Sequence, residues 1–332
     1  MNIASLPKVE LHLHLDCSLS YELVQLLNPA ISYEDYRASF VAPAKCTDLA
    51  DYITRAIKGF ELMQTKEQLR LVTLDLFKQL QADHVVYAEI RFAPLLHTMG
   101  GLTPYEVVQA VADAAEEGVS KFGVEANVIC ATLRHYTEAQ SMETVQLVEQ
   151  FKGTRIVAFD IAADEAGFPI DAHIKAFAYS KEKGIPCTAH AGEARGADSM
   201  WETLQHFHPT RIGHGVRCIE DPKLMQHLRE QDIHLEVCPT SNIQVNVFDV
   251  IENHPASRIY DAGISMSINT DARTISDTTL AKEYGIMQQY FQWTLAHFKR
   301  CNLEAIRHAF APAAVKQKLA AQIAAAYDAA MQ

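Results

Sequence analysis

The sequence predicts an α/β protein, a (β/α)8 TIM barrel with extra helices inserted after its first strand and at its C-terminal end. Eight short β-rich runs recur along the chain, and amphipathic stretches with helical spacing separate most of them. A chain of 332 residues with 48% hydrophobic content can bury one large core. An open, doubly wound sheet is the competing topology, because it uses the same alternation of strands and helices.

The runs that predict strands combine β-branched and apolar residues and are bounded by glycine, proline or polar residues. Most are followed by enough chain for a crossover helix, so we expect the strands to be parallel. The eight runs lie at 9–15, 85–92, 124–133, 156–165, 186–193, 211–215, 234–242 and 264–271.

Amphipathic patterns at 104–122 and 143–151 predict helices between strands. The connection between the first two runs is unusually long, about seventy residues, and contains helical patterns at 48–60 and 67–80. Helices inserted here either form a lid over the barrel mouth or pack on the flank of the barrel.

The C-terminal part predicts the eighth helix over 277–300, followed by two further helices. The last of them is rich in alanine and is expected to begin near Pro312. Because the chain shows no linker, low-complexity segment or block of charge, we expect one domain over 1–332.

Composition restricts the partners and the compartment. The formal net charge of −12 opposes binding to nucleic acid, and a small uncharged or cationic substrate fits better. Seven cysteines without a Cys-x-x-Cys pair indicate reduced thiols and a cytoplasmic location. No signal peptide or membrane-spanning run is recognised, so no membrane association is expected. The apolar pattern shows no separate surface stripe from which an oligomeric state would follow.

Histidine and aspartate side chains gather where the predicted strands end. His12 and His14 lie two residues apart, so both imidazoles project from the same face of a strand. His190, His214 and Asp271 lie at or near the ends of later runs. Reacting groups in such barrels sit at the C-terminal ends of strands, so we expect these side chains to converge. Three imidazoles and one carboxylate suit a catalytic zinc ion with a position open for water.

Glu193 lies three residues after His190, in the loop that follows a predicted strand. A carboxylic acid at this place can reach a bound substrate and donate a proton to it. The alternative interpretation is an acidic residue in the first turn of a helix, favoured by the helix dipole. A second His-x-His, formed by His206 and His208, precedes a strand and belongs at the opposite rim, so we assign it no metal.

Five motifs run in register through nearly the whole chain. They are PKVELHLHLD at 7–16, TAHAGE at 188–193, RIGHG at 211–215, CPTSN at 238–242 and NTD at 269–271. Together they resemble the adenosine deaminase family of the metal-dependent amidohydrolase superfamily. The resemblance implies zinc-dependent hydrolytic deamination of a 6-aminopurine nucleoside, with adenosine or deoxyadenosine converted to inosine or deoxyinosine and ammonia.

The resemblance also implies that His12, His14, His190 and Asp271 hold one zinc ion per chain. Superfamily members with two metals are similar but bridge their ions through a lysine or glutamate on the fourth strand. The run IVAFDIAA offers neither residue before Glu165, so we expect one metal.

Roles in catalysis and substrate binding follow from the same resemblance. Glu193 would protonate the purine nitrogen beside the attacked carbon, and His214 would orient the attacking water and help to deprotonate it. Asp271 would accept a hydrogen bond from this water. His14 and Asp16 would contact the substrate, with Asp16 on the 5′ side of the ribose.

The chain departs from the family pattern at positions that touch substrate. Cys17 replaces the glycine that usually follows Asp16, and Ala163 replaces another glycine, although its N–H can still donate to the purine. Ala272 stands where a second aspartate usually contacts the five-membered ring. Losing a hydrogen bond to a charged group costs about 1.5–3 kcal/mol. Arg273 is the candidate residue to replace the contact that the missing aspartate would make with the purine. We therefore keep adenine and nucleosides modified at the 5′ position, of the aminofutalosine or methylthioadenosine type, as alternative substrates.

Two other classes of function stay open at this point. One is a different amidohydrolase that cleaves a cyclic amide with the same metal, and the other is a non-catalytic zinc-binding barrel. The latter would be expected to lose Glu193 or a metal ligand, and this chain keeps both. Deaminases that flip a base out of a polynucleotide carry a Pro-Cys-x-x-Cys signature, and Pro186-Cys187 lacks the second cysteine.

Overall fold

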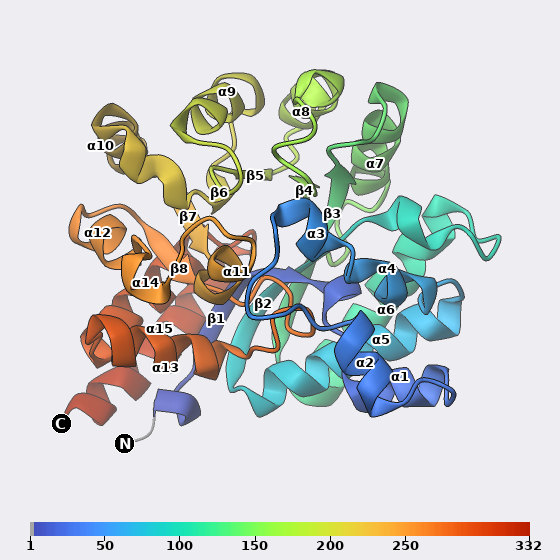
Figure 1. Ribbon diagram of the computed structural model, residues 1–332, viewed down its shortest axis with the longest axis horizontal. Coiled ribbons are helices and arrows are strands. Elements are labelled where there is room, and N and C mark those ends of the chain that lie inside the picture. The colour runs from blue at the N-terminus through green and yellow to red at the C-terminus, as the bar shows by residue number, and fades with distance from the viewer. Residues whose placement is uncertain (1–2) are drawn as a thin grey trace.

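Eight parallel strands form the centre of the computed structural model, which describes residues 3–332 (Figure 1). Each strand lies within or near a run predicted from the sequence. The strands are β1 (Lys8–His14), β2 (Val85–Phe92), β3 (Glu125–Leu133), β4 (Ile156–Ala162), β5 (Thr188–Ala191), β6 (Arg211–His214), β7 (His234–Val237) and β8 (Met266–Ile268).

The strands close into a barrel. They pair in chain order as β1 to β4 and as β5 to β8. The two groups meet through parallel bridges between Phe159 and Cys187 and between Leu13 and Asp271. At the second junction the N–H of His14 donates to the carbonyl oxygen of Asp271 at 2.8 Å. Because an open sheet has free edges at both ends, this closure excludes the doubly wound alternative and confirms the TIM-barrel prediction.

Helices cover the outside of the barrel and extend its two ends. They are α1 (Tyr21–Leu27), α2 (Tyr33–Ser39), α3 (Leu49–Ile53), α4 (Ala56–Glu61), α5 (Lys66–Ala82), α6 (Pro104–Phe122), α7 (Glu138–Gln150), α8 (Ile174–Glu182), α9 (Ala197–Phe207), α10 (Pro222–Glu230), α11 (Pro239–Gln244), α12 (Ala256–Asp261), α13 (Leu280–Phe291), α14 (Leu295–His308) and α15 (Ala313–Met331). The bounds of α6 coincide with the predicted 104–122.

The long first connection supplies both a lid and flank helices. The predicted helix at 48–60 is two short helices, α3 and α4, separated at Thr54. They lie across the end of the barrel, whereas α1 and α2 lie to one side (Figure 1). Helix α5 packs against α6 on the flank, where Arg70 pairs with Glu117 at 2.7 Å. Each of the two expected arrangements therefore applies to part of the insertion.

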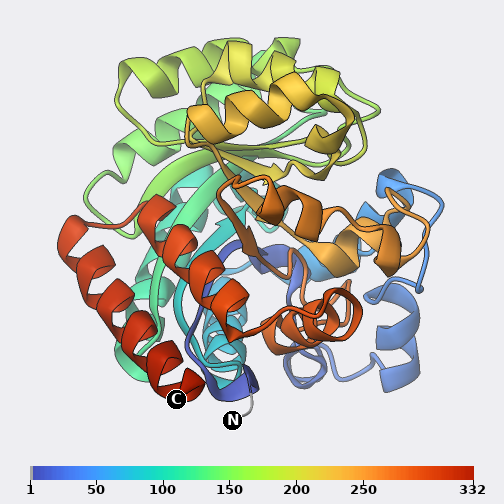
Figure 2. The same ribbon diagram turned by 90° about the vertical axis from the view of Figure 1, so that its left-hand side faces the viewer.

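The C-terminal prediction needs a correction. The pattern at 277–300 contains the whole of α13 and the start of α14, because Gln292 adopts a left-handed φ of 57° and Thr294 caps α14. Within residues 3–332 α13, as the eighth helix, is followed by two further helices, α14 and, last, α15. It begins directly after Pro312, as predicted, and lies beside α14 (Figure 2).

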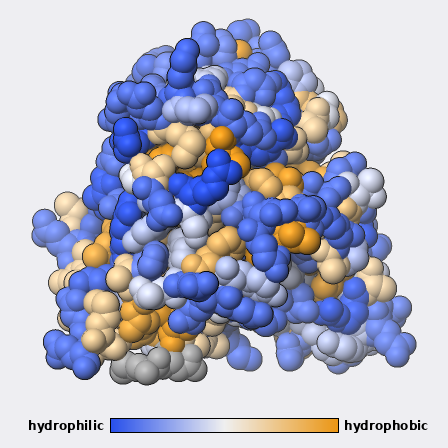
Figure 3. Space-filling view, turned by 60° about the vertical axis from the view of Figure 1, so that its left-hand side comes forward, coloured by the Kyte–Doolittle hydropathy of each residue, from blue (hydrophilic) through white to orange (hydrophobic). Residues whose placement is uncertain are grey.

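The apolar core lies between the strands and the surrounding helices and extends from Ile3 to Tyr327. The face shown in Figure 3 is mainly hydrophilic, with hydrophobic residues in separate patches. Among the helices of residues 3–332, none has the length and apolar character needed to cross a bilayer.

Candidate active site

Five polar side chains predicted from the sequence converge at the C-terminal ends of the strands. One ligand atom from each of His12, His190, His214 and Asp271 lies within 4.8 Å of the others. His14 joins the group, with its Nε2 3.2 Å from Nε2 of His190 and 3.4 Å from Oδ1 of Asp271. All of these residues are buried or nearly so.

The backbone at this rim is shaped to bring the side chains together. The N–H of Asp271 donates to the carbonyl oxygen of His12 at 3.0 Å, which fixes the chain after β8 against β1. Asp271 has φ of 65° and His214 has φ of 61°, both in the left-handed region that few non-glycine residues adopt. Such conformations often occur at functional sites, where the surrounding structure holds them in place.

Gly213 allows the imidazole of His12 to approach β6. A β-carbon at Gly213 would lie 2.8 Å from Cε1 of His12, closer than real contacts of this kind. The sequence analysis found this glycine only as part of the RIGHG motif. Its physical role becomes visible when β1 and β6 face each other across the barrel.

The convergent groups fit a divalent metal ion. Nε2 of His12 is buried and makes no hydrogen bond to any residue between 3 and 332, although Oδ1 of Asp271 lies 3.3 Å away. Burial lowers the pKa of His14, His190 and His214, so these imidazoles are neutral and carry a lone pair for a metal. Imidazole and carboxylate donors in this number suit zinc.

A buried network of charged side chains orients these histidines from below. Nδ1 of His12 lies 2.9 Å from a carboxylate oxygen of Glu236, and Nδ1 of His190 lies 3.2 Å from Asp160. Arg91 pairs with both carboxylates, at 2.7 Å and 2.9 Å. Partners of this kind fix which ring nitrogen faces a metal.

Sequence reasoning did not identify these partners. The available signal was the presence of charged residues inside three apolar strand runs, among them Arg91, Asp160 and Glu236. A charge in such a run is normally buried only when it is paired.

Glu193 is a buried carboxyl group beside this cluster. Burial raises its pKa well above the ordinary value, and the charges of Asp271 and Glu165 raise it further. The carboxylate of Glu165 accepts hydrogen bonds from the N–H groups of Gly192 and Glu193, at 2.8 Å and 3.0 Å, and so fixes the loop. Glu193 is therefore a positioned neutral acid, as a proton donor must be.

Asn242 links the acid to His214. Its Nδ2 lies 3.1 Å from Nδ1 of His214 and donates more weakly to Oε1 of Glu193 at 3.5 Å. Asn242 lies in α11, within the CPTSN motif, which the sequence analysis quoted without giving this residue a role.

A cavity of about 430 Å³ opens above the histidines and extends to the lid helices α3 and α4. Its volume is within the range of small-molecule sites. Among the predicted substrate residues, it is lined by His14, Asp16, Ala163 and Ala272. The lid contributes mainly apolar side chains, which are Leu49, Ala50, Tyr52, Ile53, Ala56, Ile57 and Phe60.

The structure corrects the prediction for Arg273. Its guanidinium is buried away from the cavity and pairs with Glu10 at 2.5 Å and with Asp83 at 3.0 Å. Both carboxylates lie below the rim, so Arg273 does not replace the missing aspartate at position 272. Ala163 does line the cavity, with φ of 78°, a strained value for a residue with a β-carbon.

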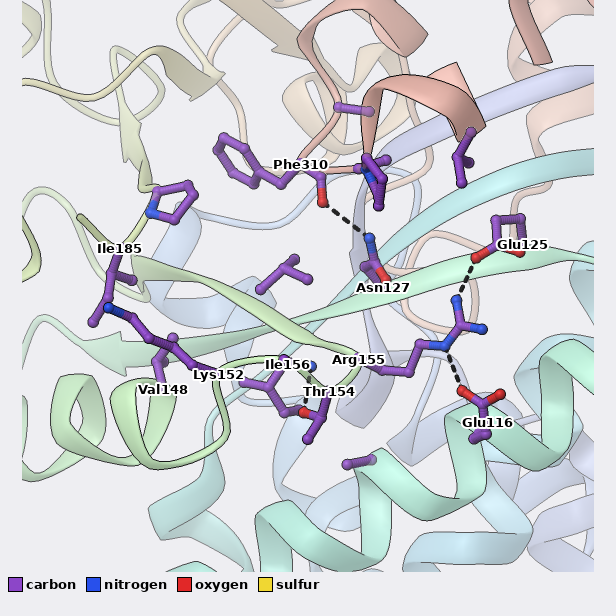
Figure 4. A pocket seen from close by; sticks show the side chains of 18 of the residues that line it. Glu116, Glu125, Asn127, Val148, Lys152, Thr154, Arg155, Ile156, Ile185 and Phe310 are labelled. Carbon is purple, nitrogen blue, oxygen red and sulfur yellow. Dashed lines mark hydrogen bonds and ion pairs between the residues drawn. The ribbon is translucent and has the colours of Figure 1, made fainter. Parts of the chain in front are cut away.

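A larger groove, of about 1210 Å³, lies at the opposite end of the barrel (Figure 4). Arg155 pairs there with Glu116 and Glu125, and Asn127 donates to the carbonyl oxygen of Phe310 at 2.9 Å. Lys152 and Lys316, which also line it, donate to backbone carbonyl groups, and none of the predicted site residues lines the groove. We therefore place the chemistry in the smaller cavity.

Neutral imidazoles around a metal-binding centre, with a protonated carboxyl group beside them at the mouth of a TIM barrel, define the class of metal-dependent barrel hydrolases. A family model described as Adenosine deaminase matches residues 7–326. The chain belongs to the adenosine deaminase family, and as a member of it is a hydrolytic deaminase that acts on purine C–N bonds.

Sequence relatives and solved structures match this chain over nearly its whole length. An adenosine deaminase of Clostridium acetobutylicum is 34% identical over 324 residues, which cover 96% of this chain and 97% of the relative. The crystal structure of an adenine deaminase from Arthrobacter aurescens superposes with a TM-score of 0.89 at 26% identity, covering 96% of this chain and 98% of the other. An amidohydrolase of Burkholderia ambifaria with bound zinc also has a TM-score of 0.89, at 21% identity, covering 98% and 91%.

Proposed function

We propose that this protein deaminates an uncharged 6-aminopurine nucleoside, such as adenosine or deoxyadenosine, with one zinc ion per chain. The observation that carries the proposal is the neutral, buried carboxyl group of Glu193 beside the cluster that contains the neutral imidazoles of His14 and His190. His12, His14, His190 and Asp271 would hold the ion. A zinc ion held there would lower the pKa of a bound water to about 7 and so would supply a nucleophile at neutral pH.

The side chains of this site divide the proton transfers between them. Glu193 donates its proton to the ring nitrogen next to the attacked carbon, which prevents negative charge from building up on the ring. Asp271 is ionised, because the close approach of His12, whose Nε2 lies 3.3 Å from Oδ1, and of the other histidines outweighs burial and holds its pKa well below the ordinary value. It accepts a proton from the attacking water and returns it to the leaving amine. His214 orients the water.

The charge of the cavity supports an unphosphorylated substrate. Of residues 3–332, no lysine or arginine lines the cavity, whereas Asp16, Asp164, Glu193 and Asp271 do. A phosphate group would meet carboxylates without a compensating cation, which is unfavourable in a site shielded from water. Burial raises the pKa of Asp16 to about 6, so this group can exchange hydrogen bonds with a ribose hydroxyl.

The apolar lid favours a second candidate substrate, a 6-aminopurine nucleoside with an apolar group at the 5′ position. Ile53, Ile57 and Phe60 from the lid and Leu96 and Phe168 from the barrel line the cavity. An apolar substituent in contact with them would gain from burial. Adenine, which lacks the ribose, is a third candidate substrate.

A panel of substrates tests the proposal. We would measure kcat/KM for adenosine, deoxyadenosine, adenine, 5′-methylthioadenosine and AMP by ammonia release, with metal content determined on the same samples. We expect turnover of the uncharged nucleosides and at least tenfold less for AMP. Asp271→Ala is expected to lose both zinc and activity. Full zinc occupancy in that variant, or no release of ammonia from any nucleoside, would contradict the proposal.

All seven cysteines of the chain are unpaired, which supports a reducing compartment, and we propose the cytoplasm. We also propose that residues 1–332 act as one domain, because the core cluster contains side chains from both ends of the barrel sequence.

A further inference from the structure

A buried histidine without a hydrogen-bond partner lies next to the cavity. His97 ends the 3-10 helix η3 (Pro94–His97), which follows β2, and its side chain is fully buried. Neither of its ring nitrogens makes a hydrogen bond to any residue between 3 and 332. The ring stacks on Phe92, with 5.9 Å between the two centroids. Buried polar groups in native proteins are nearly always hydrogen-bonded, so this imidazole needs a partner.

The carboxyl group of Asp16 is the partner that the geometry offers. Nε2 of His97 lies 3.9 Å from Oδ2 of Asp16. This gap is about 1 Å longer than an ordinary N–H···O hydrogen bond. A water molecule in line between the two atoms would hold them about 5.6 Å apart, because it needs two hydrogen bonds of about 2.8 Å. The observed distance is therefore closer to a direct contact than to a bridge through water.

Asp16 is held by long, weak hydrogen bonds. Its Oδ2 accepts from the N–H of Ala93 at 3.4 Å, and its Oδ1 accepts from the thiol of Cys17 at 3.6 Å. The residue nevertheless lines the cavity and is only 6% exposed. The carboxyl group that a ligand would meet therefore lacks a donor of ordinary strength to fix its orientation.

The imidazole of His97 has one proton to donate. Burial lowers its pKa to about 4, although the nearby backbone of Met63 acts in the opposite direction. The ring is consequently neutral at neutral pH and carries a hydrogen on one of its two nitrogens. A hydrogen on Nε2 would face Asp16, so this tautomer supplies a partner to both buried groups at once.

Helix α4 of the lid packs against both segments. It contacts the 3-10 helix η2 (Leu15–Cys17), which contains Asp16, and it contacts η3, which contains His97. A β-carbon at Gly59 of α4 would lie 2.5 Å from the carbonyl oxygen of Asp16, so the two backbones touch there. After α4, the side chain of Gln64 donates to a backbone carbonyl oxygen of η3 at 3.0 Å. A movement of α4 toward a ligand would therefore shift both segments.

We propose that His97 is a positioning residue for Asp16. When a ligand fills the cavity and the lid closes, Nε2–H of His97 donates to Oδ2 of Asp16, and this bond orients Oδ1 toward the ligand. The identity of the ligand group rests on the proposed function, in which Asp16 meets the 5′ side of the ribose. His97 does not line the cavity, so it acts on the substrate through Asp16.

Three substitutions of His97 separate a hydrogen bond from packing. Glutamine places an amide nitrogen close to the position of Nε2, asparagine places it close to that of Nδ1, and phenylalanine keeps a stacked ring without a donor. We expect His97→Phe and His97→Asn to raise KM for adenosine at least about tenfold, with kcat changed less than about threefold, and His97→Gln to restore KM. For 5′-deoxyadenosine, which lacks the hydroxyl group, all three variants should match the wild type within about threefold.

His234→Gln is the matched control. His234 is equally buried, but it begins β7 at the other end of the barrel, and its ring nitrogens lie 2.9 Å from the hydroxyl oxygens of Ser265 and Ser267. Its substitution should lower Tm without changing KM. If His97→Phe and His97→Gln change KM equally, or if KM for 5′-deoxyadenosine rises as much as KM for adenosine, the inference is wrong.

A spectroscopic measurement tests the hydrogen bond without turnover. In the zinc-loaded full chain, isotope-labelled at the histidine nitrogens, long-range proton–nitrogen NMR spectra report the tautomer of each imidazole, and His97→Gln identifies the signal of His97. We expect the neutral Nε2–H tautomer, with its proton shifted downfield when inosine is added. A hydrogen on Nδ1, or a charged ring, would overturn the inference even if the enzyme is active. If no nucleoside is deaminated, the proposed function fails, while the tautomer in the free protein still decides whether His97 can donate to Asp16.

Discussion

Glu193 shows how individual residues acquire their chemistry from their surroundings. Its carboxyl group is 3% exposed and lies near the ionised groups of Glu165 and Asp271. Burial and like charge both disfavour ionisation, so the proton is retained at neutral pH. Asp271, only a few ångströms from the histidines, is in the opposite situation and stays ionised. Two carboxyl groups in one cavity therefore differ in protonation, as the proposed roles of acid and base require.

Glu193→Gln is expected to lower kcat at least about 100-fold, because an amide cannot transfer a proton to the ring. Zinc content, measured by mass spectrometry, should remain that of the wild type. The carboxyl group acts in its protonated form, so wild-type kcat/KM should fall as pH rises through the raised pKa of Glu193. A near-normal rate in the variant would remove Glu193 from the mechanism.

Gly213→Ala is expected to weaken zinc binding about tenfold or more, because the new β-carbon would displace the imidazole of His12. Competition with a fluorescent chelator measures the affinity. Gly285→Ala is the matched control, since a β-carbon there meets no atom within 4 Å. Equal zinc affinity in the two variants would show that Gly213 does not determine the position of His12.

At the scale of elements, the insertion after β1 divides into parts with different tasks. Helices α3 and α4 face the cavity with apolar side chains, whereas α5 is attached to α6 by packing and ion pairs. Helices of five and six residues have little stability of their own, so their position depends on tertiary contacts. Elements of this kind are suited to open and close over a ligand.

Ile53→Ala and Phe60→Ala are expected to raise KM several-fold, because each removes apolar surface that lines the cavity, and burial of this surface by a substrate would be worth about 1 kcal/mol. Steady-state kinetics with the preferred nucleoside would measure this, and kcat should change less than KM. Leu26→Ala is the control, because Leu26 lies on α1 and is 66% exposed. A similar KM for all three variants would show that the lid contributes no binding energy.

At the scale of the whole molecule, the barrel encloses many buried charges, and most are paired. Arg211, for example, pairs with Glu89 at 2.5 Å and with Glu236 at 2.8 Å. Glu283 differs, because it accepts hydrogen bonds from Thr240 and Thr278 without a cationic partner in residues 3–332. Burial raises its pKa to about 7. The protonation of Glu283 therefore affects the stability of the fold near neutral pH.

The stability difference between wild type and Glu283→Gln should change between pH 6 and 8. The folded state holds the proton of Glu283 more tightly than the unfolded state does, so this contribution is complete below the ordinary pKa and is lost as pH rises through about 7. Urea unfolding at pH 6, 7 and 8 should show wild type losing stability relative to the variant, by up to about 1.4 kcal/mol per pH unit. A constant difference would contradict the raised pKa.

The order of strands, the barrel and the positions of His12, His14, His190, His214 and Asp271 at one rim were predictable from the sequence. The reason is that strand periodicity and parallel connections are local properties of the chain, and they place every strand end at the same face. Family motifs added the proposed role of Glu193.

Tertiary structure alone decided which buried groups face each other. Asp160 contacts His190, and Glu236 contacts His12. Gly213 leaves space for the imidazole of His12, and Arg273 pairs with Glu10 below the rim. These contacts join residues far apart in the chain, and their energies depend on burial and distance, which no local pattern encodes. The sequence determined where the chemistry lies, and the packing determined the protonation state and the partners of each side chain.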